Sequence, residues 1–173
     1  MDPVFHWVLR IGLALILGIS GLSKLRNPIG FRQSLANYRL LPQFLEKAAT
    51  FLIPLLELGG AILILSPAYS VGLALFLLLM VLFSGAILWG LRQGGGFNCG
   101  CLEGVEEPLS PGLLLRNALL TGLALLGYLQ PESRPLGGVD IFTVLAGSMF
   151  LFLAYLALSL SLANRVRIGS LRG

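Results

Sequence analysis

The stretch VGLALFLLLMVLFSGAILWG, residues 71–90, decides the fold of this chain because it contains no charged side chain. At about 1.5 Å per residue, a helix of this length spans the ~30 Å hydrocarbon core of a bilayer. The composition of the whole chain agrees with this segment, since 56% of its 173 residues are hydrophobic and only 12% are charged. A soluble domain carries about 25% charged residues. The sequence therefore predicts one integral membrane domain.

Several apolar segments are long enough to cross the membrane. We expect spans at roughly 4–24, 43–65, 68–91, 111–129 and 140–163. The fourth is the shortest and contains Arg116 and Asn117. Asp2 lies where a cleaved signal peptide would be basic, so the first span is expected to be retained. The predicted fold class is an all-α membrane protein, a compact bundle of about five transmembrane helices.

A different kind of element follows the first span. In segment 28–40, the apolar residues Phe31, Leu35 and Tyr38 fall at i, i+4 and i+7, while the arginines can lie on another side. This spacing predicts a short amphipathic helix. It can lie in the membrane interface, or it can be a connector that packs on protein.

The basic residues are distributed unevenly along the chain. The formal charge of +4 does not indicate nucleic-acid binding, because the cations cluster at the ends of apolar segments. The first loop and the C-terminal tail contain most of them: Lys24, Arg26, Arg32, Arg39, Lys47, Arg165, Arg167 and Arg172. With five spans, the positive-inside rule places both regions in the cytoplasm and the N-terminus outside. The loop at 92–110 then falls on the cytoplasmic side.

That loop contains the only two cysteines, Cys99 and Cys101, separated by Gly100. A disulfide across one residue needs a tight backbone, and a strained disulfide is easily reduced. Such a pair suits thiol–disulfide exchange better than scaffolding, because closing so short a loop stabilises little. The alternatives are soft-metal ligands for an ion such as Cu(I) or Hg(II), or cysteines without chemistry. Two cysteines and His6, the single histidine, do not supply the four ligands of structural zinc.

Ionisable residues inside the spans form a second group of candidates. Glu57 lies deep in an apolar segment, one turn after Pro54, and is predicted to belong to a proton relay or an intramembrane ion pair. Arg10 is the expected partner of Glu57, since it lies about as far from the outer end of the first span as Glu57 lies from that of the second. Lys24 closes the first span and is expected to reach the headgroups, with proton handling near the interface as the alternative. For Glu57, the alternative is a structural ion pair or a protonated carboxyl group bonded to a neighbouring helix.

These pieces together resemble one family of proteins. The matching stretches are SGLSKLRNP at 20–28, the F…L…YRLLP segment at 31–42, PLLELGGAILIL at 54–65 and FNCGCLEG at 97–104. In this order they resemble the DoxX-like superfamily of small bacterial membrane proteins, and within it the MauE, or methylamine-utilisation, branch. The resemblance covers most of residues 8–120. Many relatives follow the second cysteine with Phe-Gly, where this chain has Leu102-Glu103.

The resemblance implies a redox-associated membrane protein that helps to form disulfides in an exported, cysteine-rich client, alongside a thioredoxin-like partner. Cys99 and Cys101 match the CxC motif of the family. We therefore expect them to cycle between dithiol and disulfide, with no other cofactor, as in a thiol–disulfide oxidoreductase. A soft-metal carrier and a non-catalytic membrane chaperone are the alternatives. An exported client requires thiols that are accessible from outside, whereas the charge bias places the cysteine loop on the cytoplasmic side. A thiol pair that is buried in lipid, or exposed alternately to each side, would satisfy both requirements.

Overall fold

The structure is a computed structural model that describes residues 2–40, 42–94, 109–130, 134–135 and 137–171, with backbone only from residue 166. The regular structure of these residues is entirely helical. The helices are α1 (Pro3–Arg26), α2 (Pro28–Tyr38), α3 (Gln43–Leu65), α4 (Tyr69–Arg92), α5 (Pro111–Leu126) and α6 (Gly138–Leu171). The expected all-α membrane bundle is thus confirmed.

Four of these helices, α1, α3, α4 and α6, are long and apolar enough to span a membrane. The fourth expected span begins at Pro111 as predicted, but α5 has 16 residues and ends at Leu126. At about 1.5 Å per residue it is roughly 24 Å long, which is shorter than the hydrocarbon core. Hydrogen-bonded turns follow α5 as far as Leu129. Helix α6 exceeds its predicted end at residue 163 and continues to Leu171.

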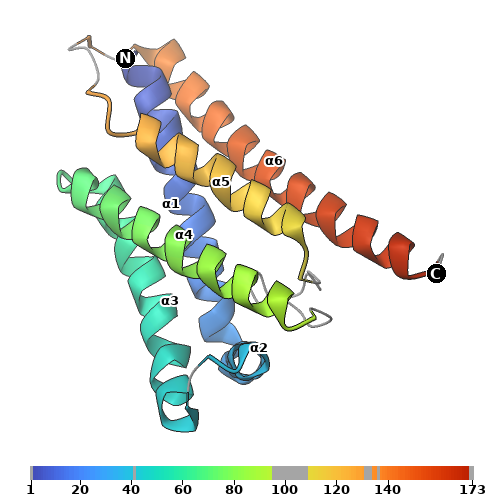
Figure 1. Ribbon diagram of the computed structural model, residues 1–173. Helices are drawn as coiled ribbons and strands as arrows, with labels where there is room; N and C mark the ends of the chain where they lie inside the picture. The colour runs from blue at the N-terminus through green and yellow to red at the C-terminus, as the bar shows by residue number, and fades with distance from the viewer. Residues whose placement is uncertain (1, 41, 95–108, 131–133, 136, 172–173) are drawn as a thin grey trace.

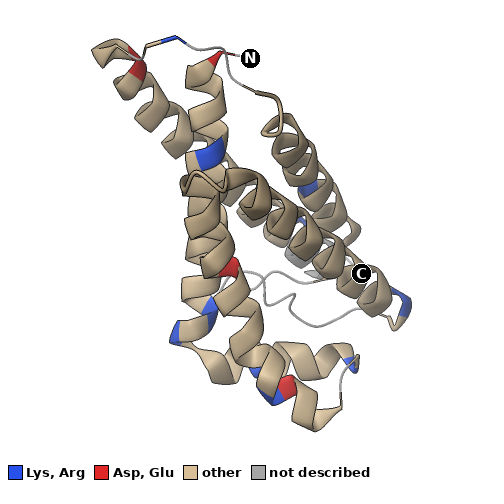
Figure 2. Ribbon diagram, turned by 90° about the vertical axis from the view of Figure 1, so that its left-hand side faces the viewer, with Lys and Arg blue, Asp and Glu red and all other residues tan. Residues whose placement is uncertain are grey.

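Consecutive long helices run in opposite directions, and α2 lies across one end of the bundle (Figure 1). The C-terminal ends of α1 and α4 and the N-terminal ends of α3 and α5 point toward this end. Figure 2 shows basic residues around α2 and the adjoining end of α1. Helices α3 and α4 meet at their Ser66–Ala68 connection and diverge toward α2.

Small residues set how closely the helices approach at two crossings. A Cβ atom on Gly72 of α4 would lie 2.4 Å from the backbone nitrogen of Ile64, so only glycine fits where α4 meets α3. A Cβ atom on Gly21 of α1 would lie 3.0 Å from the backbone oxygen of Pro54 and 3.1 Å from Cβ of Glu57. Close approach through small residues is the usual packing of helices in lipid. Here it brings α1 directly against the part of α3 that carries Glu57.

Helix α2 starts at a capped N-terminus and packs on protein. The side chain of Asn27 accepts a hydrogen bond of 2.9 Å from the backbone nitrogen of Gly30, and Pro28 occupies the first turn. Of the expected apolar face, Phe31 and Tyr38 are buried. The predicted short helix is therefore confirmed, with its aromatic face on the bundle, and its place in the membrane interface stays a prediction.

Candidate functional site

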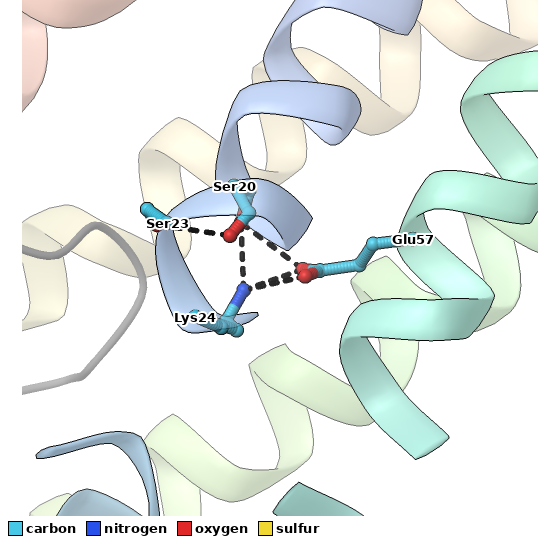
Figure 3. Close-up of polar contacts among 4 residues, drawn as sticks. All are labelled: Ser20, Ser23, Lys24 and Glu57. Carbon is cyan, nitrogen blue, oxygen red and sulfur yellow. Dashed lines mark hydrogen bonds and ion pairs between the residues drawn. The ribbon is translucent and has the colours of Figure 1, made fainter. Parts of the chain in front are cut away.

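A buried polar cluster joins α1 to α3 (Figure 3). Nζ of Lys24 donates to both carboxylate oxygens of Glu57, at 2.6 and 2.8 Å, and to Oγ of Ser20 at 2.6 Å. Oγ of Ser20 in turn donates to Oε1 of Glu57 at 3.0 Å. Ser20 and Lys24 are four residues apart on α1, so their side chains share one face of the helix. The three side chains form a closed network in which each charge has an opposite partner.

The cluster is fully inside the protein. The side chain of Lys24 is 3% exposed and that of Glu57 is 0% exposed. The expectation that Lys24 reaches the headgroups is therefore wrong. Its side chain lies back along α1 toward Ser20, the direction in which Cα–Cβ bonds of a helix tilt. Of the predicted residues, the structure brings Lys24 and Glu57 together as an intramembrane ion pair.

Arg10 occupies a separate site at the other end of α1, so its predicted pairing with Glu57 is wrong. Its Nε donates to the backbone oxygen of Ile64 and its Nη2 to that of Ser66, both at 2.8 Å. The guanidinium carbon lies 4.4 Å from the ring centroid of Trp7 and 4.6 Å from that of Tyr69. Arg10 therefore caps the last carbonyl groups of α3, which have no partners within the helix.

The buried ion pair lies on the wall of a cavity of about 350 Å³. All six helices line this cavity, and most of the lining side chains are apolar. Its polar lining includes Ser20, Lys24, Glu57, Arg116, Asn117 and Tyr155. Small-molecule sites commonly have this form, a largely apolar pocket of about 300–1,000 Å³ with a few convergent polar groups.

Residues of α5 and α6 complete the polar wall, and reasoning from the sequence did not select them. Arg116 is buried, and its Nη1 donates to Oγ of Ser159 at 3.0 Å. The guanidinium carbon of Arg116 lies 5.3 Å from the ring centroid of Tyr155. Asn117 donates to Oγ of Ser84 on α4 at 3.2 Å. The available signal was an arginine and an amide inside an apolar span, where polar groups face the bundle interior.

The predicted catalytic pair, Cys99 and Cys101, lies outside the described residues. The described residues that flank segment 95–108 meet at the end of α2. Nε2 of Gln93 donates to the backbone oxygen of Tyr38 at 3.5 Å, and Leu109 belongs to the same buried cluster as Tyr38. Tyr38 also lines the cavity. Burial raises the pKa of the Tyr38 phenol to about 12, since burial disfavours the charged phenolate.

The described part of the chain contains no candidate metal centre. Within it, no group of three or more His, Cys, Asp or Glu side chains is close enough to hold an ion. His6 is buried, and its ring packs edge-on against Tyr69 at a centroid distance of 5.2 Å. The soft-metal alternative therefore depends on Cys99 and Cys101, which the structure does not describe.

The chain is similar to known proteins over most of its length. The profile of the family described as methylamine utilisation protein MauE matches residues 2–130, which include both cysteines and the Lys24–Glu57 pair. The MauE protein of Paracoccus versutus is 36% identical over 92% of this chain and 88% of its own length. That of Paracoccus denitrificans is 33% identical over the same shares. That of Methylophilus methylotrophus is 35% identical over 92% of this chain and 86% of its own length. No solved structure matches the chain.

Proposed function

The chain belongs to the MauE family of methylamine utilisation proteins, and on this premise we propose that it is an inner-membrane accessory protein that performs thiol–disulfide exchange. Its partner is a thioredoxin-like protein, and its client is an exported, cysteine-rich protein of methylamine utilisation. The wider kinship with the DoxX-like superfamily belongs to the same proposal. The observation that carries it is the Cys99-Gly100-Cys101 sequence, which contains every sulfhydryl group of the chain.

The exchange proceeds through a mixed disulfide. A thiolate of the partner attacks the Cys99–Cys101 disulfide, forming a bond to one sulfur and releasing the other as a thiolate. The second thiolate of the partner then attacks the mixed disulfide. The partner leaves as a disulfide, and Cys99 and Cys101 remain as a dithiol after taking up two protons. The short spacing favours this cycle, because a strained disulfide is a better oxidant than a relaxed one.

The surroundings of the described flanks are consistent with an exchange site. Both flanks of segment 95–108 contact or cluster with Tyr38, which lines a cavity that also has buried ionisable groups on its wall. Thiol chemistry moves protons as well as electrons, and the Lys24–Glu57 pair is the buried acid–base group on that cavity wall. In the proposal, this pair serves as the proton relay, while Arg10 is structural.

The orientation of the bundle is part of the proposal. Basic residues gather around α2 (Figure 2), which favours the cytoplasm for this end and for the C-terminus, and the outside for the N-terminus. An exported client requires access from the outside. Labelling of intact cells with a membrane-impermeant maleimide, compared with a permeant one, determines which side the two thiols face.

A redox titration tests the exchange itself. The purified protein is equilibrated in buffers of graded thiol–disulfide potential, and its free thiols are trapped with a mass tag. We expect Cys99 and Cys101 to gain two tags together at a single midpoint. In the single variants Cys99→Ser and Cys101→Ser, the remaining cysteine should capture a thioredoxin-like partner as a mixed disulfide. The double variant Cys99→Ser/Cys101→Ser is the matched control and should capture none.

Other results would contradict the proposal in distinct ways. If the redox titration shows no disulfide between the two cysteines, but the thiols bind Cu(I) stoichiometrically against a competing chelator, the protein is a soft-metal carrier. If the double serine variant supports growth on methylamine as well as the unmodified protein does, the protein acts as a chaperone without thiol chemistry.

A further inference from the structure

The cavity beside the ion pair opens toward lipid at the depth of the acyl chains. Leu56 of α3 and Leu82 of α4 line it, and both are exposed, by 36% and 57%. They lie in the interior of membrane-spanning helices, where an exposed apolar side chain faces lipid. The lining residues of α4 run from Leu79 to Ile87, so at about 1.5 Å per residue they lie roughly 8–20 Å along the helix from its end at Arg92. Acyl chains of one leaflet fill these depths, because half of the hydrocarbon core is about 15 Å thick.

The cations on the inner wall of the cavity are already engaged within the protein. Nζ of Lys24 uses its three donors on the Glu57 carboxylate and on Ser20. Arg116 donates to Ser159. Most of the other lining side chains are apolar. This wall therefore favours an apolar ligand, since a charged one would lose its hydration here without gaining a partner that is still available.

Arg39 lies at the α2 end of the cavity in a conformation that glycine adopts more easily. It is exposed, and it lies between Tyr38 and Leu40, both of which line the cavity. Its φ of 50° and ψ of 31° are left-handed, and among the described residues other than glycine it alone has a positive φ. Glycine or asparagine is usual where a helix ends in this way, because a longer side chain makes the left-handed conformation costly. An arginine held there against its conformational preference indicates a role for the side chain.

A second arginine belongs to the same corner of the bundle. Gln93, at the end of α4, donates to the backbone oxygen of Tyr38 at 3.5 Å, and Arg92 precedes it. Arg92 is exposed as well. Of the carboxylates that the structure describes, none forms an ion pair with Arg39 or Arg92. The α2 end of the cavity is therefore positively charged where the spanning helix α4 ends, which is the level of the lipid phosphates.

We propose that this cavity binds an anionic phospholipid, with one acyl chain in the cavity and the phosphate against Arg39 and Arg92. The guanidinium fork suits a phosphate, because it donates two parallel hydrogen bonds to neighbouring oxygens. Two cations favour a lipid with net negative charge over a zwitterionic one, whose ammonium group they would repel. The bound chain would cover the Lys24–Glu57 pair on the side that opens to lipid. This inference goes beyond the proposed function and does not depend on thiol chemistry.

Binding is tested on the full-length protein in detergent by native mass spectrometry. The probes are phosphatidylglycerol and phosphatidylcholine with identical acyl chains, so that only the headgroup charge differs. We expect one phosphatidylglycerol per protein, bound about tenfold more tightly than phosphatidylcholine, the difference expected for one charge-assisted hydrogen bond. Inorganic phosphate should not displace it, because the phosphate alone lacks the chain that fills the cavity.

Four variants test the two halves of the site. Arg39→Gly should weaken phosphatidylglycerol binding about tenfold, yet without lipid it should melt at or above the temperature of the unmodified protein, because glycine suits the left-handed position. Arg26→Ala removes an exposed cation from the end of α1 and should leave binding unchanged. Ala86 lines the cavity, whereas Ala74 of the same helix is exposed on its outer surface. Ala86→Phe should therefore abolish binding, and Ala74→Phe should preserve it.

Several results would overturn the inference. Equal affinity for the two lipids would show that headgroup charge is not recognised. Displacement by inorganic phosphate would show an anion site without a chain site, and unchanged binding by a folded Ala86→Phe protein would place the chain elsewhere. An Arg39→Gly protein that binds phosphatidylglycerol normally, or that melts below the unmodified protein, would remove Arg39 from the site or assign it to the structure of α2. Because Arg39→Gly is expected to fold, the inference stays testable even if Ala86→Phe does not fold.

Discussion

Removal of one member of the Lys24–Glu57 pair should be far more harmful than removal of both. The ammonium group of Lys24 donates a hydrogen bond to each carboxylate oxygen of Glu57. The two side chains are 3% and 0% exposed. Lys24→Met therefore leaves a buried carboxylate that keeps the hydrogen bond from Ser20 but loses its cation. Breaking a buried pair in this way costs about 3–5 kcal/mol. Replacing both charges, as in Lys24→Met/Glu57→Leu, should cost less than about 1 kcal/mol, because no charge is left buried without its partner.

The assay is equilibrium unfolding in mixed micelles by added sodium dodecyl sulfate, followed by far-ultraviolet circular dichroism. A double-mutant cycle over Lys24→Met, Glu57→Leu and the double variant gives the coupling energy. The Arg134–Asp140 pair is the control, since its side chains are 51% and 23% exposed and its atoms are 3.1 Å apart. Arg134→Ala should cost at most about 1 kcal/mol. Additive losses for the two buried sites, or single variants as stable as the unmodified protein, would refute the reasoning.

The same unfolding assay tests three further sites. Gly72→Ala should destabilise by about 1–3 kcal/mol, since its Cβ would lie 2.4 Å from the backbone nitrogen of Ile64, whereas Gly59→Ala, with nothing within 4 Å, should be neutral or stabilising. Arg10→Lys should cost about 1 kcal/mol or more, because an ammonium cannot reproduce the fork that spans two carbonyl groups. The folded-state pKa of Tyr38, about 12, exceeds the ordinary value of 10.0, so its contribution to stability is complete below pH 10 and is lost as the pH rises toward 12. Tyr38→Phe should remove that part of the pH dependence, as measured by the unfolding free energy across this interval.

The sequence was sufficient to predict the helices, because apolar length and capping residues are local signals. Asn27 and Pro28 mark the start of α2, and the structure has it there. No local signal in the sequence identifies the partner of Glu57 in this way. The position of a residue along its span predicts its depth in the membrane but ignores the reach of a long side chain. Lys24 lies near the end of its helix, yet its ammonium lies back along α1 to Ser20 and meets Glu57 there.

Arg10 illustrates the same limit from the other end of α1. Its guanidinium extends to the end of α3 and lies near the rings of Trp7 and Tyr69. The sequence shows an arginine and a glutamate in adjacent spans, but it does not show that backbone carbonyl groups and aromatic rings already stabilise the arginine. The cavity was equally hidden, since its lining comes from six helices and depends on the angle at which α3 and α4 diverge. Such tertiary geometry leaves no periodic signal in one chain.

The paired removal of charge also decides whether the Lys24–Glu57 pair is structural or takes part in proton transfer. If it only joins α1 to α3, the Lys24→Met/Glu57→Leu protein should fold and should exchange disulfides with its thioredoxin-like partner at the unmodified rate. We expect the variant to fold but to exchange disulfides with its thioredoxin-like partner about a hundredfold more slowly, because the proposed proton relay is absent. A positioned acid–base group contributes about 10²–10⁴-fold to a proton transfer. Single-turnover measurements of disulfide exchange at saturating partner separate this effect from binding. An unchanged rate in the folded variant would assign the pair to structure alone, because no ionisable side chain of the pair would remain to carry the proton.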